Sequence, residues 1–293
     1  MTGSLPPRPA RKDPLETGLL LGPGALWLFL FGAVPLLLVA AASVLTRGEF
    51  GGVTPEPTLE HYGRFFEPLY LQILGQTALW AVLTTAGCLL LGFPMAWVIA
   101  RSRRHRNLLL FLVILPFWSS FLVRTFAMIF LLRDSGLVNS ILVGTGLVSE
   151  PVTLLYTPGA VLLGLVYGFL PFMVLPIYAA LERLDPALLE AAEILGARPA
   201  ARFFTVVLPL SLPGVVAGAL LVFVSAFGSF LTPDLLGGAR EMMIGNLVQN
   251  QFTTARNWPF GSAISLVVMA VVLATVLVSL RLRDRPGKPA AGG

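Results

Sequence analysis

Charged side chains are scarce in this chain. Only 12% of its 293 residues are Asp, Glu, Lys or Arg, whereas ordinary soluble domains carry about 25%. Hydrophobic residues make up 56%, and the mean hydropathy is +0.83. Apolar stretches of roughly 20 residues recur along the sequence, and each is long enough to cross the hydrocarbon core of a bilayer. The composition therefore excludes an ordinary soluble protein and predicts a polytopic membrane protein.

Cysteine and histidine are almost absent as well. The single cysteine, Cys88, excludes an internal disulfide and a multi-cysteine metal site. The two histidines, His61 and His105, lie in separate loops, and neither an HExxH nor a GxxxxGK[ST] motif occurs. We therefore expect no metal site, no catalytic centre and no ATP-binding site in this chain. The sequence does not predict an enzyme.

The apolar stretches predict an all-α fold with six membrane-spanning helices. They lie at about 19–45, 71–100, 108–132, 158–181, 212–232 and 259–280. One membrane domain is expected over 19–282, between polar tails at 1–18 and 283–293. The connections Ser135–Val148 and Pro233–Asn250 are partly apolar, and we expect them to form short surface helices.

The basic residues indicate how the helices are oriented. Fourteen of the 20 lie in the two tails and in the loops after spans two and four, and only five lie in the opposite loops. The fourteen are Arg8, Arg11, Lys12, Arg101, Arg103, Arg104, Arg106, Arg183, Arg198, Arg202, Arg281, Arg283, Arg285 and Lys288. This distribution is typical of topology control rather than of nucleic-acid binding, and it predicts that both termini and the loop 182–211 are cytoplasmic.

The loop 182–211 has its own helix signals. Asp185 followed by Pro186 is an N-cap and first-turn pair, and Gly196 is placed as a helix stop. Pro199 begins a second short helix that leads back to the membrane. Between these signals four apolar residues recur at helical spacing: Leu188, Leu189, Ala192 and Leu195. The loop is therefore predicted to be a helix–turn–helix at the membrane surface, with Glu190 and Glu193 on another face.

Seven positions in this loop resemble a known motif. They are Glu190, Ala191, Ala192, Gly196, Val206, Leu208 and Pro209. Their spacing is similar to that of the EAA loop of ABC-importer permeases, which usually has isoleucine where this chain has Val206. The resemblance implies that the loop docks on a separate ATPase subunit, which binds ATP and Mg²⁺. An ordinary pair of interfacial helices is the alternative interpretation.

The resemblance narrows in four other stretches, at 59–74, 116–132, 165–178 and 235–263. They are similar to the spermidine/putrescine permeases of the PotB/PotH type. This family implies the fold of a type I ABC-importer permease in the bacterial inner membrane. It also implies a second, homologous permease, two ATPase subunits and a periplasmic substrate-binding protein as partners, with spermidine or putrescine as the solute.

The substrate path is less clear from the residues. A polyamine needs carboxylates, carbonyl oxygens or aromatic faces along its path, yet the nearest acidic residue to a span is Asp234, at the external end of predicted span five. Some family members have glutamate where this chain has Ser229. Arg124 lies inside predicted span three, near Trp118, and either lines the path or lies at a subunit interface; we favour a structural or interface role.

Two alternatives stay open at this point. The chain could be an ABC permease for another small solute, such as an amino-acid-like, opine-like or phosphonate compound. A secondary transporter is the rival from a different class, but such carriers usually have membrane carboxylates or broken helices from inverted repeats, and neither is evident. An EAA-like loop would have no purpose in such a carrier.

Overall fold

The computed structural model describes residues 22–49, 51–102, 104–238 and 241–283. The predicted tail 1–18 lies outside the described residues, as does nearly all of the predicted tail 283–293. Six helices in the described part are long and apolar enough to cross a membrane. They are Gly22–Ser43, Pro68–Arg101, Phe121–Gly144, Pro158–Glu182, Pro199–Phe227 and Trp258–Arg281. The predicted all-α, six-span architecture is therefore confirmed, with corrections to spans three and five.

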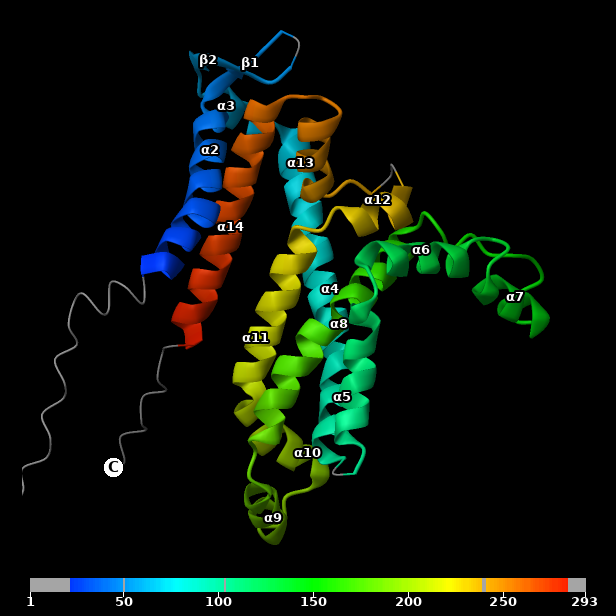
Figure 1. The fold of residues 1–293 in the computed structure, drawn as a ribbon. Coiled ribbons are helices and arrows are strands. Elements are labelled where there is room, and N and C mark those ends of the chain that lie inside the picture. The colour runs from blue at the N-terminus through cyan, green and yellow to red at the C-terminus, as the bar shows by residue number, and fades with distance from the viewer. Residues whose placement is uncertain (1–21, 50, 103, 239–240, 284–293) are drawn as a thin grey trace, which may run out of the picture.

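Three long helices form the centre of the bundle (Figure 1). They are α4 (Pro68–Arg101), α8 (Pro158–Glu182) and α11 (Leu208–Phe227), and α8 packs along both of the others. Glycine allows the close approach of α8 and α11, since a Cβ at Gly214 would lie 2.5 Å from the carbonyl oxygen of Pro176. Small residues at such contacts are typical of helix packing in membranes, where dispersion rather than water exclusion drives association.

An outer pair of helices packs beside this centre. The pair consists of the N-terminal helix, which includes a π-helical turn η1 (Phe29–Ala33) and α2 (Val34–Ser43), and of α14 (Trp258–Arg283). In the most apolar 18-residue stretch of the first span, no residue is buried within the protein, whereas 56% of the residues in the corresponding stretch of α8 are buried. The exposed side chains are large and apolar, for example Trp27, Leu28 and Phe31. Such a surface requires a hydrocarbon or protein environment.

The two ends of the bundle differ (Figure 1). At one end, here called the hairpin end, lie a two-stranded antiparallel sheet and the helices α3 (Glu60–Phe65) and α13 (Ile244–Thr253). The strands β1 (Leu45–Arg47) and β2 (Val53–Pro57) pair Arg47 with Val53 and were not predicted. At the opposite end, here called the loop end, lie α9 (Pro186–Ile194) and α10 (Pro199–Arg202).

The predicted span three is not one helix. It consists of α5 (Arg106–Ile114), a 3₁₀ turn η2 (Leu115–Trp118) and α6 (Phe121–Leu132), and α6 turns away from the bundle axis (Figure 1). Pro116 has no N–H to continue the helix, and Ser119 and Ser120 are extended, with ψ of 150° and 141°. The Ser119 hydroxyl donates to the carbonyl oxygen of Pro116 at 2.7 Å, which closes the turn.

The predicted span five is displaced toward the loop end. The helix runs without interruption from Pro199 to Phe227 through α10, a π-helical turn η3 (Phe203–Val207) and α11. The helix ends at Phe227, and the connection that follows is held to α13 by the Asn246 side chain, which donates to the carbonyl oxygen of Phe230 at 2.7 Å. Both connections expected to form short helices are helical, as α7 (Leu137–Gly144), α12 (Leu231–Gly237) and α13. However, α7 lies within the third candidate span, and α12 buries Thr232 and Leu236, so the expected surface position does not hold for these two.

Candidate functional site

The helix α9 begins at the predicted cap. Asp185 has extended backbone angles, and its Oδ1 accepts a hydrogen bond from the N–H of Ala187 at 2.9 Å. Pro186 occupies the first helical position, where its missing N–H costs nothing and its fixed φ suits the helix. The start of the helix is thus determined by two adjacent residues.

The helix α9 also ends where the sequence predicts. Gly196 has φ of +78°, the N–H of Ala197 donates to the carbonyl oxygen of Ala192 at 3.0 Å, and the N–H of Gly196 donates to that of Glu193 at 2.9 Å. These two bonds define a Schellman motif, which favours glycine because its left-handed residue carries no Cβ penalty. A Cβ at Gly196 would meet nothing within 4 Å, so the glycine serves the backbone rather than packing within the chain.

An ion pair links the two arms of this loop. Arg202 Nη1 on α10 lies 2.5 Å from Glu193 Oε2 on α9. α10 continues into α11, so this ion pair connects α9 to a helix of the bundle centre. The predicted second short helix begins at Pro199 as expected and continues into the membrane helix without a break. The wider π-helical turn η3 precedes Pro209 and gives room for its ring, which would clash with a carbonyl oxygen in a regular α-helix.

The inner face of the loop rests on the loop end of α4. Leu189 is half-buried and lines two adjoining cavities with Trp97 and Arg101. The Phe203 ring packs edge-on against Phe93, with centroids 5.3 Å apart, and against Trp97 at 6.5 Å. The Arg101 guanidinium lies 4.2 Å from the centre of the Trp97 ring. The predictions did not include the contacts of Phe203, since they join residues more than 100 positions apart.

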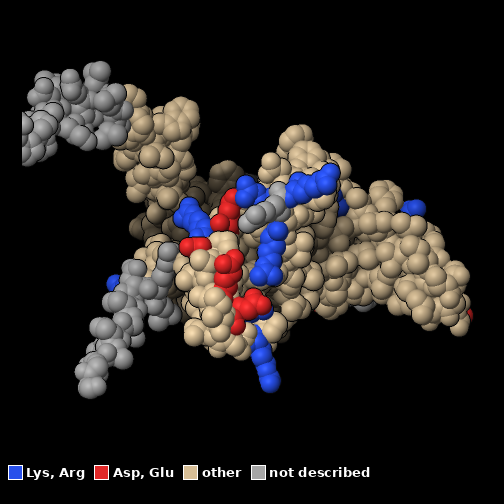
Figure 2. Space-filling model, turned by 90° about the horizontal axis from the view of Figure 1, so that it is seen from below, with Lys and Arg blue, Asp and Glu red and all other residues tan. Residues whose placement is uncertain are grey.

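The outer face of the loop is apolar at its tip and charged around it. Ile194 and Leu195 are each 86% exposed, while Glu190 is exposed and has no ion pair among the described residues. In Figure 2, seen from the loop end, acidic residues gather over this face with basic residues on either side. The predicted apolar stripe is therefore divided, with Leu189 turned inward and Leu195 outward. Ile194, two residues before the motif glycine Gly196, was not predicted.

A second ion pair joins neighbouring helices at the loop end. Arg106 Nη1, at the start of α5, lies 2.7 Å from Glu182 Oε1, at the end of α8. Both side chains are about two-fifths exposed, so solvent screens much of the attraction. The pair fixes the spacing of α5 and α8 more than it stabilises the fold.

The predicted path residues do not form one site. Arg124 is half-buried on α6, with its guanidinium 4.5 Å from the Phe117 ring centre and 5.4 Å from that of Phe121. Its Nε and Nη1 atoms are buried without a hydrogen-bond partner among the described residues. Trp118 is 77% exposed and packs against Phe111 instead.

The two other predicted path residues lie beyond the end of α11. Ser229 is buried just after this helix, and Asp234 is exposed on α12 rather than at the end of a span. Both positions follow from the turn after Phe227, which places them in the connection between α11 and α13.

An acidic group against α4, toward the hairpin end, was not predicted. Glu241 follows α12 and accepts a hydrogen bond from the Gln76 side chain on α4, with Nε2 and Oε2 3.0 Å apart. One residue further along α4, the Thr77 hydroxyl accepts from the N–H of Ile244 at 2.8 Å. The sequence places Glu241 outside every span, so only the fold shows that it lies against α4. Among the described residues, no three His, Cys, Asp or Glu side chains are grouped as metal ligands would be.

Residues 88–283 match the family described as the inner membrane component of binding-protein-dependent transport systems. The chain belongs to this family. It is 44% identical to the spermidine/putrescine transport system permease protein PotB of Haemophilus influenzae, over 88% of this chain and 92% of the relative. It is 42% identical to the PotB protein of Escherichia coli K12, over 87% and 93% of the two chains. The resemblance found in the sequence is thereby confirmed.

Two further comparisons agree with this assignment and with the fold. An inner membrane ABC transporter permease of Escherichia coli K12, YdcU, is 37% identical over 87% of this chain and 85% of the relative. A crystal structure of a bacterial alginate ABC transporter, in complex with a periplasmic protein bound to an alginate pentasaccharide, superimposes with a TM-score of 0.75. That chain is 21% identical, with 94% and 96% of the two chains covered, and it shows the fold alone. The chain is thus a multi-pass inner-membrane transport component with an ABC-permease fold.

Proposed function

We propose that this chain is the permease subunit of an ATP-driven importer that moves spermidine or putrescine across the inner membrane. The observation that carries the proposal is the capped and ion-paired α9–α10 loop, which is continuous with α11 and leaves the EAA-like positions Glu190, Ala191 and Gly196 exposed. The partners are a second, homologous permease, two ATPase subunits that bind ATP and Mg²⁺, and a periplasmic protein that delivers the solute.

The proposed orientation places the loop end and both termini in the cytoplasm. Its support is the excess of arginine and lysine in the tails and in the loops after α4 and α8. The hairpin end then faces the periplasm, where the delivered solute would arrive.

Coupling follows from how α9 is connected. A partner that grips the exposed tip at Ile194 and Leu195 moves α9 as a unit, because both of its ends are fixed by caps. The Glu193–Arg202 pair and the continuous helix transmit that movement to α11. Leu189 transmits it to α4 through Trp97. ATP-driven closure of the partner would in this way act on two of the three central helices.

The polyamine assignment is supported by the names of the relatives that match at 42–44% identity. A polyammonium solute needs oxygen acceptors, and the hairpin end offers Glu241, held by Gln76, and the exposed Asp234. We propose that Glu241 helps to receive the cation before it enters the bundle. The Gln76 hydrogen bond orients the carboxylate without neutralising it.

A second candidate is an importer of another small solute that carries an anionic group, such as an amino-acid-like, opine-like or phosphonate compound. The observation that favours it is Arg124, whose buried Nε and Nη1 have no acceptor among the described residues. The buried Ser229, just after α11, supplies no negative charge for a cation.

The solute is tested by titrating the cognate periplasmic protein with spermidine, putrescine and a panel of anionic and zwitterionic solutes. Tight binding of a polyamine supports the first candidate, and binding of an anionic or zwitterionic solute supports the second. Uptake of the bound solute is then measured in proteoliposomes that contain the chain and its partner subunits. Uptake that persists without the ATPase would contradict an ATP-driven importer and favour a secondary transporter.

Docking is tested by co-purification of the ATPase with a Glu190→Lys variant. We expect the ATPase to be lost, because the substitution reverses the charge of an exposed motif position. Glu150→Lys is the matched control, since Glu150 is equally exposed but lies outside the loop. Equal retention in both variants would remove Glu190 from the docking surface. The purified chain alone should hydrolyse no ATP.

A further inference from the structure

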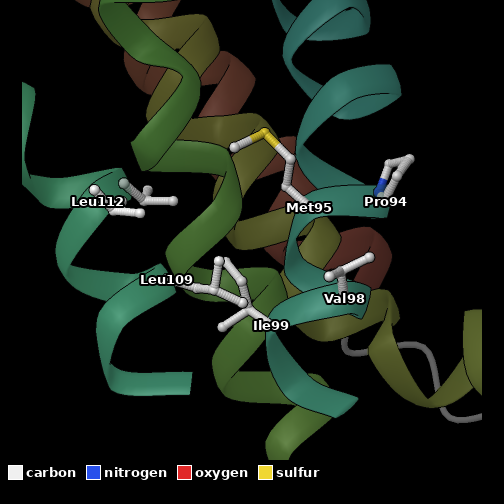
Figure 3. A pocket seen from close by; sticks show the side chains of 7 residues that line it. Pro94, Met95, Val98, Ile99, Leu109 and Leu112 are labelled. Atoms are coloured by element: carbon white, nitrogen blue, oxygen red, sulfur yellow. The ribbon is translucent and has the colours of Figure 1, made fainter. Parts of the chain in front are cut away.

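An apolar groove lies between α4 and α5, in the half of the bundle nearest the loop end (Figure 3). Its volume is about 390 Å³. The α4 side is formed by Pro94, Met95, Val98 and Ile99, and the α5 side by Leu109, Leu112 and Val113. Val98 is 58% exposed and Leu112 is 50% exposed, so the groove is open along its side. It shares no lining residue with the two cavities beneath the α9–α10 loop, which Arg101 lines, and it is separate from Glu241.

The groove ends at a cluster of arginines. Arg101 is the last residue of α4 and Arg106 the first of α5, and Arg104 lies in the turn between them. Arg106 precedes Leu109 by one helical turn and Val113 by about two turns, so its side chain and the groove share one face of α5. The distance along α5 from Arg106 to Val113 is about 10 Å at 1.5 Å per residue.

Two of these arginines keep an uncompensated charge. Arg106 is paired with Glu182, and Arg101 lies over Trp97. Arg101 and Arg104 are exposed and have no ion pair within the part of the chain that the structure describes. A positive cluster one to two helical turns from an apolar groove is complementary to an anionic lipid. The arginines match the charge of the headgroup phosphate, and the groove matches the acyl chain joined to it.

We infer that this groove binds one anionic phospholipid of the surrounding bilayer, with an acyl chain along Val98 and Leu112 and the headgroup phosphate on Arg101 and Arg104. The seven lining residues offer no hydrogen-bonding side chain, so a polar solute would gain nothing there. A neutral lipid could fill the groove but would leave the arginine charge unused. The site depends neither on which solute is carried nor on which side of the membrane the loop end faces.

The inference is tested with the full-length chain in phosphatidylcholine nanodiscs that contain a trace of photoactivatable phosphatidylglycerol. The probe has a diazirine in one acyl chain, and labelled peptides are mapped by mass spectrometry. We expect the phosphatidylglycerol probe to label residues 95–113 more strongly than a phosphatidylcholine probe with the same diazirine. Removing one arginine should lower labelling by the phosphatidylglycerol probe about fivefold, because one basic residue near the membrane surface typically contributes about 1 kcal/mol to anionic-lipid binding.

Three variants separate headgroup from acyl-chain contacts. Arg101→Gln and Arg104→Gln should lower labelling by the anionic probe only, whereas Val98→Trp should block both probes because the indole fills the groove. Arg281→Gln and Leu277→Trp on α14 are matched controls, since both residues are exposed in the described structure. Equal labelling by the two probes, or no change in the arginine variants, would overturn the inference. Cross-links from the groove to a partner protein would also overturn it.

Discussion

The α9–α10 loop and the break between α5 and α6 both redirect a helix near a proline, but they are held in different ways. In the loop, the cap at Asp185, the turn at Gly196 and the Glu193–Arg202 pair all lie within 18 residues of sequence. At the break, the Phe117 and Phe121 rings beside Arg124 pack against two rings of α8 that lie about 50 residues away in sequence. Phe117 packs against Phe172, and Phe121 packs against Phe169.

The direction of the chain is set by neighbouring residues in the α9–α10 loop and by packing against another helix at the α5–α6 break. A turn closed by its own residues forms the same geometry in any context, which suits a loop that must keep its shape while a partner moves it. A direction set by packing across helices changes when the packing changes. The loop is therefore expected to move as a rigid unit, whereas the angle of α6 depends on α8.

The largest expected effect is at the turn of the loop. Gly196→Asp should abolish uptake while leaving membrane insertion intact, because the added charged side chain projects from the proposed docking surface, while aspartate tolerates the left-handed backbone better than most residues. Gly196→Asn is the control, since asparagine tolerates positive φ at a helix C-terminus. Uptake in proteoliposomes and ATPase co-purification measure both variants.

The outcomes at Gly196 have distinct meanings. If Asn also abolishes uptake, any side chain at this position blocks docking. If uptake is normal in the Gly196→Asn variant and lost in the Gly196→Asp variant, the added charge rather than the added volume causes the loss. Normal uptake with Asp would contradict the assignment of the turn to the docking surface.

The next largest effect tests the tertiary control of α6. A Cβ at Gly168 on α8 would lie 3.0 Å from Cε2 of Phe121, so Gly168→Val should displace the root of α6 and cost about 1–3 kcal/mol of unfolding free energy. Gly75→Val on α4 is the control, because a Cβ there meets nothing within 4 Å. Denaturant unfolding in detergent measures both. Equal costs would show that α6 does not depend on this contact.

Proline alone could not have located the break. Pro94, Pro171, Pro176 and Pro213 all lie inside continuous helices, while Pro116 precedes the break. Membrane helices tolerate proline when neighbouring helices satisfy the freed groups, so the outcome depends on packing that the sequence does not display. Hydropathy predicted six spans because a membrane span is recognised by the length of an apolar stretch. It carries no information on a change of helix direction within such a stretch.

The same distinction applies to the candidate site. Asp185, Pro186 and Gly196 were predictable because caps act within a few residues. Trp97 and Ile194 were not, since one contacts the loop from another helix and the other is identified only by its exposure. The strands β1 and β2 are each five residues or shorter and lie beside membrane spans, so no alternating pattern marked them.

A smaller effect is expected at Arg124. Arg124→Leu loses an aromatic contact of about 0.5–2 kcal/mol but also removes two buried nitrogens that have no acceptor among the described residues, so the unfolding free energy should change by less than about 1 kcal/mol. The control is Arg133→Leu, an exposed arginine 5.2 Å from the Phe130 ring centre. A cost above about 2 kcal/mol at Arg124 would indicate an acceptor within the chain.

The smallest effect concerns the ion pair of the loop. A double-mutant cycle of Glu193→Gln and Arg202→Gln should give a coupling energy of about 0.2–1 kcal/mol, because the Glu193 side chain is 67% exposed and water screens the charges. High salt should lower this coupling further. The Arg106–Glu182 pair is the comparison, since it joins α5 to α8 rather than the two arms of one loop. If the first pair transmits movement, uptake should fall in the Glu193 variant by more than its stability cost explains, and the Glu182→Gln variant should show no such excess.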